Sequence, residues 1–292
     1  MELFLQQVLA GFATGSIYAL MALALVMIYR AIHHLNFAQG EMAMFSTFMA
    51  WQFIAWGASY WVAFLATVAI SFLGGVFIER VVFRPIRHAP ALSHIVVFIA
   101  LFVIFNSLAG FIWDFTIKPF PTPFGTTPLF GTGLIGAHQA GMLVVILVVL
   151  ALIFSFFRFT RVGLALRAAA ASPDSARLVG IRVGWMMALG WGMASAVGAV
   201  AGMMIAPMVF LEPNMMLNIL LYGFAGAVLG GLASPGGAVL GGFMVGVVEN
   251  LAGTYIPVIG SELKLPIALF LIIAVLVLRP SGLFGRRIVE RV

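Results

Sequence analysis

The sequence contains no cysteine and very little charge. Without Cys among its 292 residues, the chain forms neither disulfides nor thiolate metal sites. Only 8% of the residues are charged whereas 63% are hydrophobic, and so little polar surface cannot cover a water-soluble core. The composition therefore predicts an integral membrane protein.

Motifs for catalysis and for nucleotide binding are also missing. No Gly-rich loop ends in Lys-Ser or Lys-Thr, which excludes phosphate binding of the P-loop kind. The five histidines lack the spacing of a metalloprotease helix, and Ser195 and Ser234 have no basic residue near them in sequence. We predict a chain that is not an enzyme and binds no cofactor. The chain has a net charge of +6. An excess of Lys and Arg in cytoplasmic loops accounts for such a charge in a membrane protein, so we predict no nucleic-acid partner.

Long uncharged runs make up most of the sequence. A transmembrane helix needs about 20 apolar residues, and hydrocarbon excludes unpaired backbone groups, so these runs predict an all-α membrane protein. Two of them are long enough to cross twice, with breaks at Trp56–Trp61 and at the Gly-rich stretch Gly230–Gly242. We predict one transmembrane domain over residues 1–292, a polytopic bundle of eight or nine segments in which the Gly-rich pair either crosses or is broken and re-entrant. The runs are Leu3–Tyr29, Met42–Ile78, Ile95–Trp113, Gln139–Phe157, Trp185–Leu211, Pro213–Val248 and Leu265–Leu278.

The basic residues are distributed asymmetrically between the predicted loops. With the N-terminus outside, 13 of the 15 Lys and Arg fall on the inner face, and only Lys118 and Lys264 lie opposite. Cytoplasmic loops carry such an excess, so the pattern predicts an outside N-terminus and a cytoplasmic C-terminus.

One long loop is predicted on each side. The outer loop, 114–138, is too rich in Pro, Gly and Thr for a helix. The inner loop, 158–184, contains two short helical stretches, the second beginning with Ser172 as N-cap and Pro173 at the first helical position and stopping at Gly180. An interfacial helix on membrane lipid and a protrusion that docks on a protein are equally compatible with these residues.

Seven polar residues within the apolar segments are candidates for a substrate path, because polar groups at bilayer depth are costly and often functional. Asn36 and Gln39 have the spacing of a capping box, so capping is the alternative role for the motif that they form with Glu41. Glu249 is either an acid exposed at the membrane interface near Tyr255 or a path residue. The seven candidates are Asn36, Gln39, Glu41, Asn106, Asn218, Glu249 and Asn250.

Small residues recur every four positions, for example at Gly11, Gly15 and Ala19. In lipid this spacing lets helix backbones approach closely, so we interpret it as packing. The density of Gly in the later Gly-rich stretch indicates a helix break of the kind that transporters place near a pathway. The predicted break or gate residues are Gly230, Gly231, Ser234, Pro235, Gly236 and Gly237.

Three ordered stretches resemble one family of transport proteins. They are "GSIYALMALALVMIYRAIHHLNFAQGEMAMFSTFMA" at Gly15–Ala50, "RVGLALRAAAASPDSARLVGI" at Arg161–Ile181 and "AGAVLGGLASPGGAVLGGFMVGVVEN" at Ala225–Asn250. Together they are similar to the branched-chain amino-acid ABC importer permeases of the LivH type. The resemblance implies a permease subunit in a bacterial inner membrane, paired with a second, LivM-type permease. It also implies two cytoplasmic ATPase subunits that bind ATP and Mg, and a periplasmic substrate-binding protein.

The resemblance also implies where this chain meets its ATPase. The family's contact segment corresponds to Gly163 through Ile181, which gives the candidate coupling residues Gly163, Leu164, Arg167, Asp174, Ala176, Gly180 and Ile181. Urea and short-amide importers share the architecture, so those substrates are the alternatives to branched-chain amino acids. A self-contained channel or secondary carrier is the alternative from another class.

Overall fold

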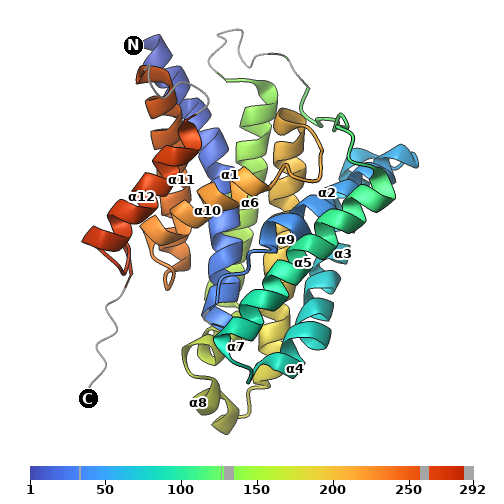
Figure 1. Cartoon of the computed structure of the whole chain (residues 1–292), viewed down its shortest axis with the longest axis vertical. Coiled ribbons are helices and arrows are strands. Elements are labelled where there is room, and N and C mark those ends of the chain that lie inside the picture. The colour runs from blue at the N-terminus through green and yellow to red at the C-terminus, as the bar shows by residue number, and fades with distance from the viewer. Residues whose placement is uncertain (33, 126, 128–134, 257–262, 286–292) are drawn as a thin grey trace. The chain divides into compact units, whose positions relative to one another are not determined.

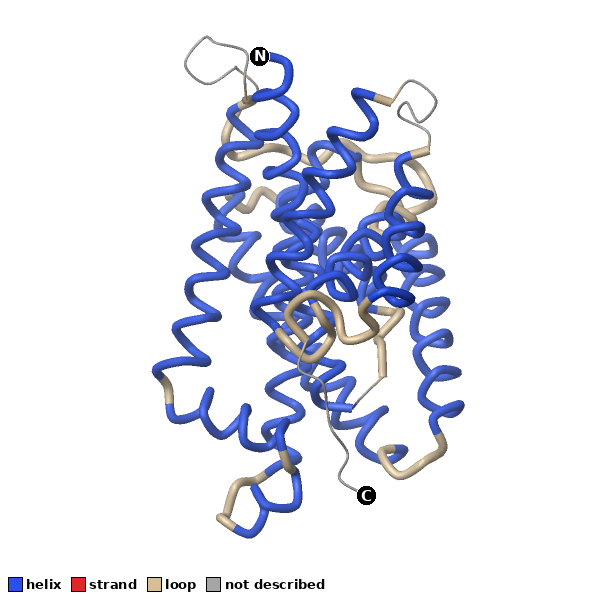
Figure 2. The backbone as a smooth tube through the Cα atoms, turned by 90° about the vertical axis from the view of Figure 1, so that its left-hand side faces the viewer, coloured by secondary structure: helices blue, strands red, loops and turns tan. Residues whose placement is uncertain are grey.

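The computed structural model describes residues 1–32, 34–125, 127, 135–256 and 263–285, and these residues form helices joined by turns (Figures 1 and 2). Lys118 and Leu211 form an isolated antiparallel bridge. The helices are α1 (Glu2–Ile32), α2 (Gln39–Ala55), α3 (Tyr60–Ile78), the π-helical turn η1 (Glu79–Phe83), α4 (Arg84–Ile86), α5 (Ala91–Trp113), α6 (Ala137–Phe159), α7 (Arg161–Ala171), α8 (Pro173–Leu178), α9 (Val183–Val209), α10 (Leu217–Gly230), α11 (Pro235–Tyr255) and α12 (Lys264–Leu278).

Both predicted interruptions of the long apolar runs are confirmed. Helix α2 ends at Ala55 and α3 begins at Tyr60, while α10 ends at Gly230 and α11 begins at Pro235. Six described helices are long and apolar enough to cross a membrane: α1, α3 with its extension to Ile86, α5, α6, α9 and α11. Helices α10 and α12 are apolar but shorter. At 1.5 Å per residue, the 14 residues of α10 reach about 21 Å, less than the hydrocarbon thickness.

The first compact unit comprises residues 1–26, 124–144 and 218–292. Its helices α1 and α11 lie against each other through small residues. A Cβ atom on Gly11 would lie 2.7 Å from the Cα of Val247, and one on Gly15 would lie 2.9 Å from the carbonyl oxygen of Phe243. The four-residue spacing of glycines is therefore a packing feature, as predicted.

The Gly-rich break between α10 and α11 is a tightly hydrogen-bonded turn of the same unit. Ser234 caps α11 by accepting a hydrogen bond from the Gly237 N–H at 3.1 Å. Gly231 has φ +104°, a conformation that a side chain would strain. The carbonyls of Leu229 and Gly230, left unpaired by the end of α10, accept hydrogen bonds from the backbone at 283 and 284, at 2.8 and 3.2 Å.

The second compact unit comprises residues 27–123 and 145–217. Helices α2, α3 and α9 pack on one another there, and α5 packs on α2. The rings of Phe83, Phe98 and Trp191 contact one another, with centroids of Phe83 and Trp191 4.4 Å apart. Small residues again bring backbones together. A Cβ atom on Gly202 of α9 would lie 2.9 Å from the Ala43 carbonyl oxygen of α2.

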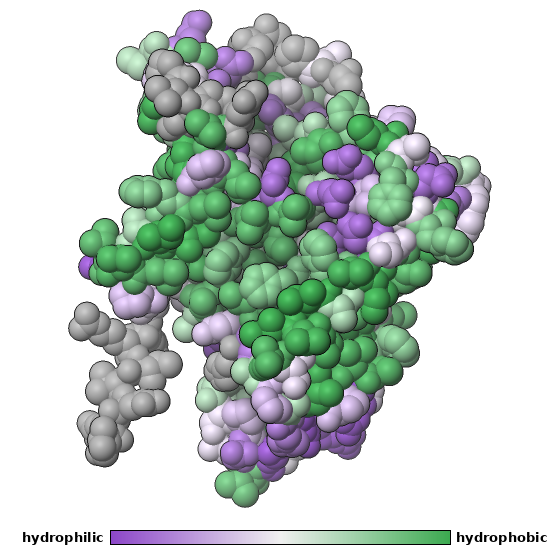
Figure 3. All heavy atoms as spheres, viewed as in Figure 1, coloured by the Kyte–Doolittle hydropathy of each residue, from purple (hydrophilic) through white to green (hydrophobic). Residues whose placement is uncertain are grey.

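The predicted inner loop of the second unit forms a hook of two short helices, α7 and α8. Thr160 caps α7 by accepting from the Gly163 N–H at 2.9 Å, and Ser172 caps α8 by accepting from the Ser175 N–H at 3.4 Å. Pro173 occupies the start of α8, and Gly180 follows with φ +83°. The predicted helix start and stop are therefore confirmed. Figure 3 shows hydrophilic side chains gathered over the α4, α7 and α8 end of this unit; its exposed arginines are Arg84, Arg87, Arg158, Arg161, Arg177 and Arg182.

The described part of the predicted outer loop contains no helix before α6 begins at Ala137. Lys118 and Leu211 exchange backbone hydrogen bonds of 2.9 and 3.0 Å, which ties this loop to the α9–α10 connection. The stretch at 128–134 lies outside the described residues.

Candidate functional site

The seven predicted path residues separate into local groups. Asn36 and Gln39 form one group in the second unit, and Glu41 with Asn106 forms another. In the first unit Glu249 and Asn250 make contacts to α1. Asn218, the second residue of α10, is exposed.

Asn36 and Gln39 are fully buried and bond to the protein around them. The Gln39 side-chain N–H donates to the Ala194 carbonyl of α9 at 2.9 Å, and the Asn36 amide donates to the Gln39 oxygen at 3.3 Å. The predicted capping box is wrong. Helix α2 begins at Gln39 itself, and Asn36 instead closes the preceding turn by accepting from the Ala38 N–H at 3.0 Å. The spacing does not produce a capping box because the Gln39 side chain bonds to α9 instead of to the backbone at Asn36.

Glu41 is a carboxylate with neutral partners. It is 1% exposed and accepts a hydrogen bond of 3.2 Å from the side-chain amide of Asn106. The same amide nitrogen lies 3.0 Å from the Pro213 carbonyl and 3.1 Å from the Asn214 side-chain oxygen. Among the residues that the structure describes, no Lys, Arg or His makes an ion pair with Glu41.

This Glu41 group has more acceptors than donors. An Asn amide carries two hydrogens, but that of Asn106 faces three oxygens, so one acceptor can take a hydrogen bond from another donor. Asn214 is exposed, Asn106 is half-buried and Glu41 is buried. The exposed fraction thus falls from Asn214 through Asn106 to Glu41, and the acceptor left over in this group would suit an N–H or ammonium donor.

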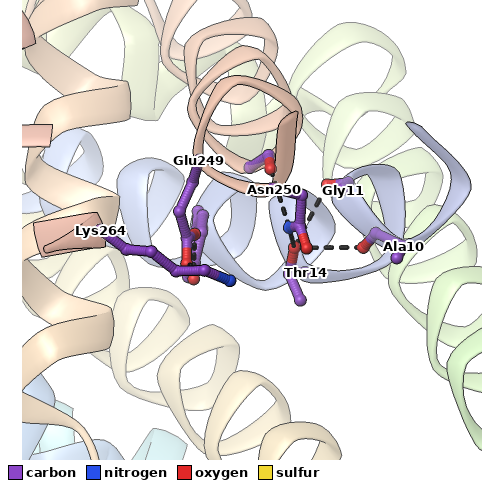
Figure 4. Close-up of polar contacts among 8 residues, drawn as sticks. Ala10, Gly11, Thr14, Glu249, Asn250 and Lys264 are labelled. Carbon is purple, nitrogen blue, oxygen red and sulfur yellow. Dashed lines mark hydrogen bonds and ion pairs between the residues drawn. The ribbon is translucent and has the colours of Figure 1, made fainter. Parts of the chain in front are cut away.

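Glu249 lies in a different setting in the first unit (Figure 4). Its carboxylate accepts a hydrogen bond of 2.7 Å from the Tyr18 hydroxyl of α1, and the Tyr222 ring of α10 stacks on Tyr18 at 4.8 Å. The Lys264 ammonium of α12 is 3.9 Å from the other carboxylate oxygen. Glu249 is 8% exposed, so its interpretation as an interface-exposed acid near Tyr255 is wrong. The reason is tertiary packing, because α1, α10 and α12 surround it.

Asn250 joins α11 to α1. Its amide donates to the Thr14 hydroxyl at 2.9 Å and to the Gly246 carbonyl of its own helix at 3.0 Å (Figure 4). Thr14 in turn donates to the Ala10 carbonyl at 3.2 Å. Such a link between helices is a packing contact typical of membrane proteins.

The predicted coupling residues divide by exposure. Leu164, Asp174 and Gly180 are exposed, and Asp174 pairs with Arg177 at 2.9 Å. Gly163 and Ala176 are buried, so they shape the hook from within rather than present a surface. Arg167 and Ile181 are half-buried.

Two exposed apolar residues of the hook are not among the coupling residues predicted from the sequence. Leu178 and Val179, at the end of α8, are 89% and 76% exposed. An apolar pair directly after Arg177 in a polar segment was the available signal in the sequence.

The predicted break residues line one turn. A Cβ atom on Gly230 or on Gly237 would collide with the backbone of the other, whereas one on Gly236 would meet open space. With Gly231, Ser234 and Pro235, they bring α10 and α11 into backbone contact.

Comparison with known proteins identifies the family. The family described as "Branched-chain amino acid transport system / permease component" matches residues 7–278. The chain belongs to this permease family. It is 31% identical to the high-affinity branched-chain amino acid transport system permease protein LivH of Salmonella typhimurium over 305 residues, which cover 99% of this chain and 98% of that protein. LivH of Escherichia coli (strain K12) is 30% identical over the same shares, and BraD of Pseudomonas aeruginosa is 31% identical over 99% and 98%.

The permease also resembles a solved structure. PsaBC from Streptococcus pneumoniae in complex with Fab aligns with a TM-score of 0.52 over 93% of this chain and 91% of that chain, at 11% identity. At this identity the likeness concerns the fold alone. The permease is thus a helical, multi-pass membrane protein.

Proposed function

We propose that the chain is the membrane subunit of an ATP-driven importer for branched-chain amino acids in a bacterial inner membrane. The observation that carries this proposal is end-to-end similarity to LivH and BraD, both named as permeases for these substrates. Eight or nine segments, with the N-terminus outside and the C-terminus in the cytoplasm, fit the arginine distribution. Residues 1–292 then act as one permease domain, with segment 114–138 outside and segment 158–184 inside.

The energy source is proposed to lie on partner subunits. The chain has no P-loop, so two cytoplasmic ATPase subunits would bind ATP and Mg. A second, LivM-type permease would complete the membrane part, and a periplasmic binding protein would deliver the substrate.

The hook is proposed to transmit ATPase motion. Leu164, Leu178 and Val179 expose apolar surface at an end where arginines gather. The small core of Ala169, Ala176 and Val183 makes the hook a packed unit rather than a loose loop. A packed element can pass a displacement to α9, which begins at Val183.

The path is proposed to run past the buried polar groups. The Glu41 group offers an acceptor to a donor group of the substrate, and Asn36 with Gln39 holds α2 on α9 beside it. The turn at 230–237 would serve as the point about which α10 and α11 move.

The docking step has a direct test in the hook. Gly180→Trp, which places a bulky side chain at φ +83°, and Asp174→Arg are expected to reduce both ATPase recovery in pull-downs and leucine uptake. Gly184→Ala is the control, since nothing lies within 4 Å of a Cβ atom there. Wild-type recovery and uptake in both hook variants would remove the docking role.

The substrate class has a separate test on the cognate binding protein. Calorimetry with leucine, isoleucine and valine is expected to show binding, and urea and acetamide are expected to show none. Binding of urea or acetamide alone would replace amino acids by those substrates in this proposal.

A further inference from the structure

Glu249 and Lys264 form a charge pair with one fixed and one movable member. The carboxylate is held by the Tyr18 hydroxyl at 2.7 Å, and Tyr18 is itself held by stacking on Tyr222. The ammonium is carried on the flexible four-carbon stem of lysine, and its side chain is 29% exposed against 10% for that of Glu249. Figure 4 shows Lys264 lying alongside Glu249. Lys264 can therefore move away without a change in the backbone.

The pair is loose compared with a tight charge-assisted hydrogen bond. Its 3.9 Å separation exceeds the 2.7–2.9 Å typical of an ammonium hydrogen-bonded to a carboxylate. The carboxylate thus keeps a hydrogen-bonding position that another ammonium can occupy.

Helix stabilisation does not explain the charges. Lys264 is the first residue of α12, where the helix dipole disfavours a cation. Glu249 lies in the C-terminal part of α11, where an anion gains nothing from the dipole. A buried acid and a half-buried lysine at such positions call for an explanation other than local helix energetics.

We propose that Glu249 and Lys264 recognise the zwitterionic head group of the amino acid during its passage. As the pair parts, the Glu249 carboxylate takes the substrate α-ammonium and the Lys264 ammonium takes the α-carboxylate. Tyr18 keeps the Glu249 carboxylate in place, and stacking on Tyr222 holds Tyr18 in turn. This inference rests on the proposed function, because urea and neutral amides have no such pair of charges.

The test measures binding to the complete importer in nanodiscs without the periplasmic protein. Labelled leucine is displaced by unlabelled leucine, by isoamylamine, which lacks the carboxylate, or by isocaproate, which lacks the ammonium. In the wild type, leucine should compete best. Glu249→Gln and Lys264→Gln should each weaken leucine at least about tenfold. In Glu249→Gln, leucine should compete no better than isocaproate, because the partner of its ammonium is lost. In Lys264→Gln, leucine should compete no better than isoamylamine, because the partner of its carboxylate is lost.

A matched control comes from the second unit. Glu79 is 5% exposed and lies 3.8 Å from Arg80, so Glu79→Gln removes a comparable pair and should leave leucine binding unchanged. If Glu249→Gln does not fold, the double variant Glu249→Gln/Lys264→Met is tested instead, because it leaves no uncompensated charge. The double variant should bind leucine, isoamylamine and isocaproate equally.

Three results would overturn the inference: unchanged binding in the variants, an equal loss for all three ligands, or a wild type that imports leucine but does not bind it in this assay. An importer that fails to import leucine even with its binding protein would instead remove the proposed function.

Discussion

Each compact unit buries one of the two glutamates that were predicted to line a substrate path. The groups around the two carboxylates differ, because one carboxylate has a neutral partner and the other lies beside a cation. In the second unit, Glu41 is 1% exposed and bonds to the neutral amide of Asn106. In the first unit, Glu249 is 8% exposed and lies beside the Lys264 ammonium.

The difference indicates two ways of keeping a carboxylate in a membrane protein. Glu41 depends on an amide shared with two further acceptors, so its surroundings are short of donors. Glu249 depends on a hydroxyl and on a cation that can move. Substitutions should therefore affect the two units differently.

The largest effect is expected where helix backbones touch. A Cβ atom on Gly246 of α11 would overlap the backbone of Gly15, and neither helix can yield locally. Gly246→Val should destabilise the first unit by more than about 3 kcal/mol or prevent folding. Gly202→Val should be costly too, but part of its clash is with the Thr47 hydroxyl, which can rotate.

Thermal unfolding of detergent-purified protein measures both variants. Gly236→Ala is the control, because its Cβ would meet nothing within 4 Å. A monodisperse Gly246→Val protein with wild-type melting would contradict the contact between α1 and α11.

The second effect concerns the donor of the Glu41 group. Asn106→Leu removes the amide that serves Glu41, Pro213 and Asn214 and leaves a buried carboxylate without that donor. The expected loss is about 2–3 kcal/mol in the free energy of unfolding. The double variant Glu41→Leu/Asn106→Leu should recover most of it. An additive double variant in a denaturant titration would show that the two residues are not coupled.

The third effect compares the two glutamates directly. Glu249→Gln leaves Lys264 without its counter-charge and should cost about 1–2 kcal/mol, a value reduced by the partial exposure of Lys264. Glu41→Gln should cost under about 1 kcal/mol, because Asn106 can still donate to the new amide oxygen. Melting temperatures of the two variants measure this difference in stability. A larger drop in melting temperature for Glu41→Gln than for Glu249→Gln would contradict the expected order.

The smallest effect concerns two similar helix starts, Ser172-Pro173 and Ser234-Pro235. Removing either cap by Ser→Ala should lower the local stability of the capped helix by about 1 kcal/mol. In the exposed hook we expect faster amide exchange at Ser175 with no change in melting, whereas at the packed turn Ser234→Ala should lower the melting temperature. Hydrogen exchange and thermal unfolding measure the two variants. An equal drop in melting temperature for Ser172→Ala and Ser234→Ala would show that the two helix starts do not differ in this way.

Local signals made the helix breaks and the hook predictable. The N-caps at Ser172 and Ser234 each precede a proline, and Gly180 and Gly231 permit the positive φ that follows a helix end. The four-residue glycine spacing likewise predicted close packing of helix backbones, and the contact between α1 and α11 confirms it; which helices would meet was not predicted.

Partners of the buried polar groups could not be predicted, because they are distant in sequence. Asn106 is 65 positions from Glu41, and Tyr18 is 231 positions from Glu249. The same cause explains the capping error, since the spacing of Asn36 and Gln39 matched a local motif while Gln39 bonds to α9. A polar residue within an apolar run indicates that a partner exists but does not identify it.

Uptake by the reconstituted importer tests the central claim most directly. Proteoliposomes containing this chain, its permease partner and the ATPase subunits are supplied with the binding protein and labelled leucine. ATP-dependent accumulation that stops when either the binding protein or ATP is omitted is the predicted result. Leucine uptake by this chain alone, without ATP, would contradict the account and identify a self-contained carrier.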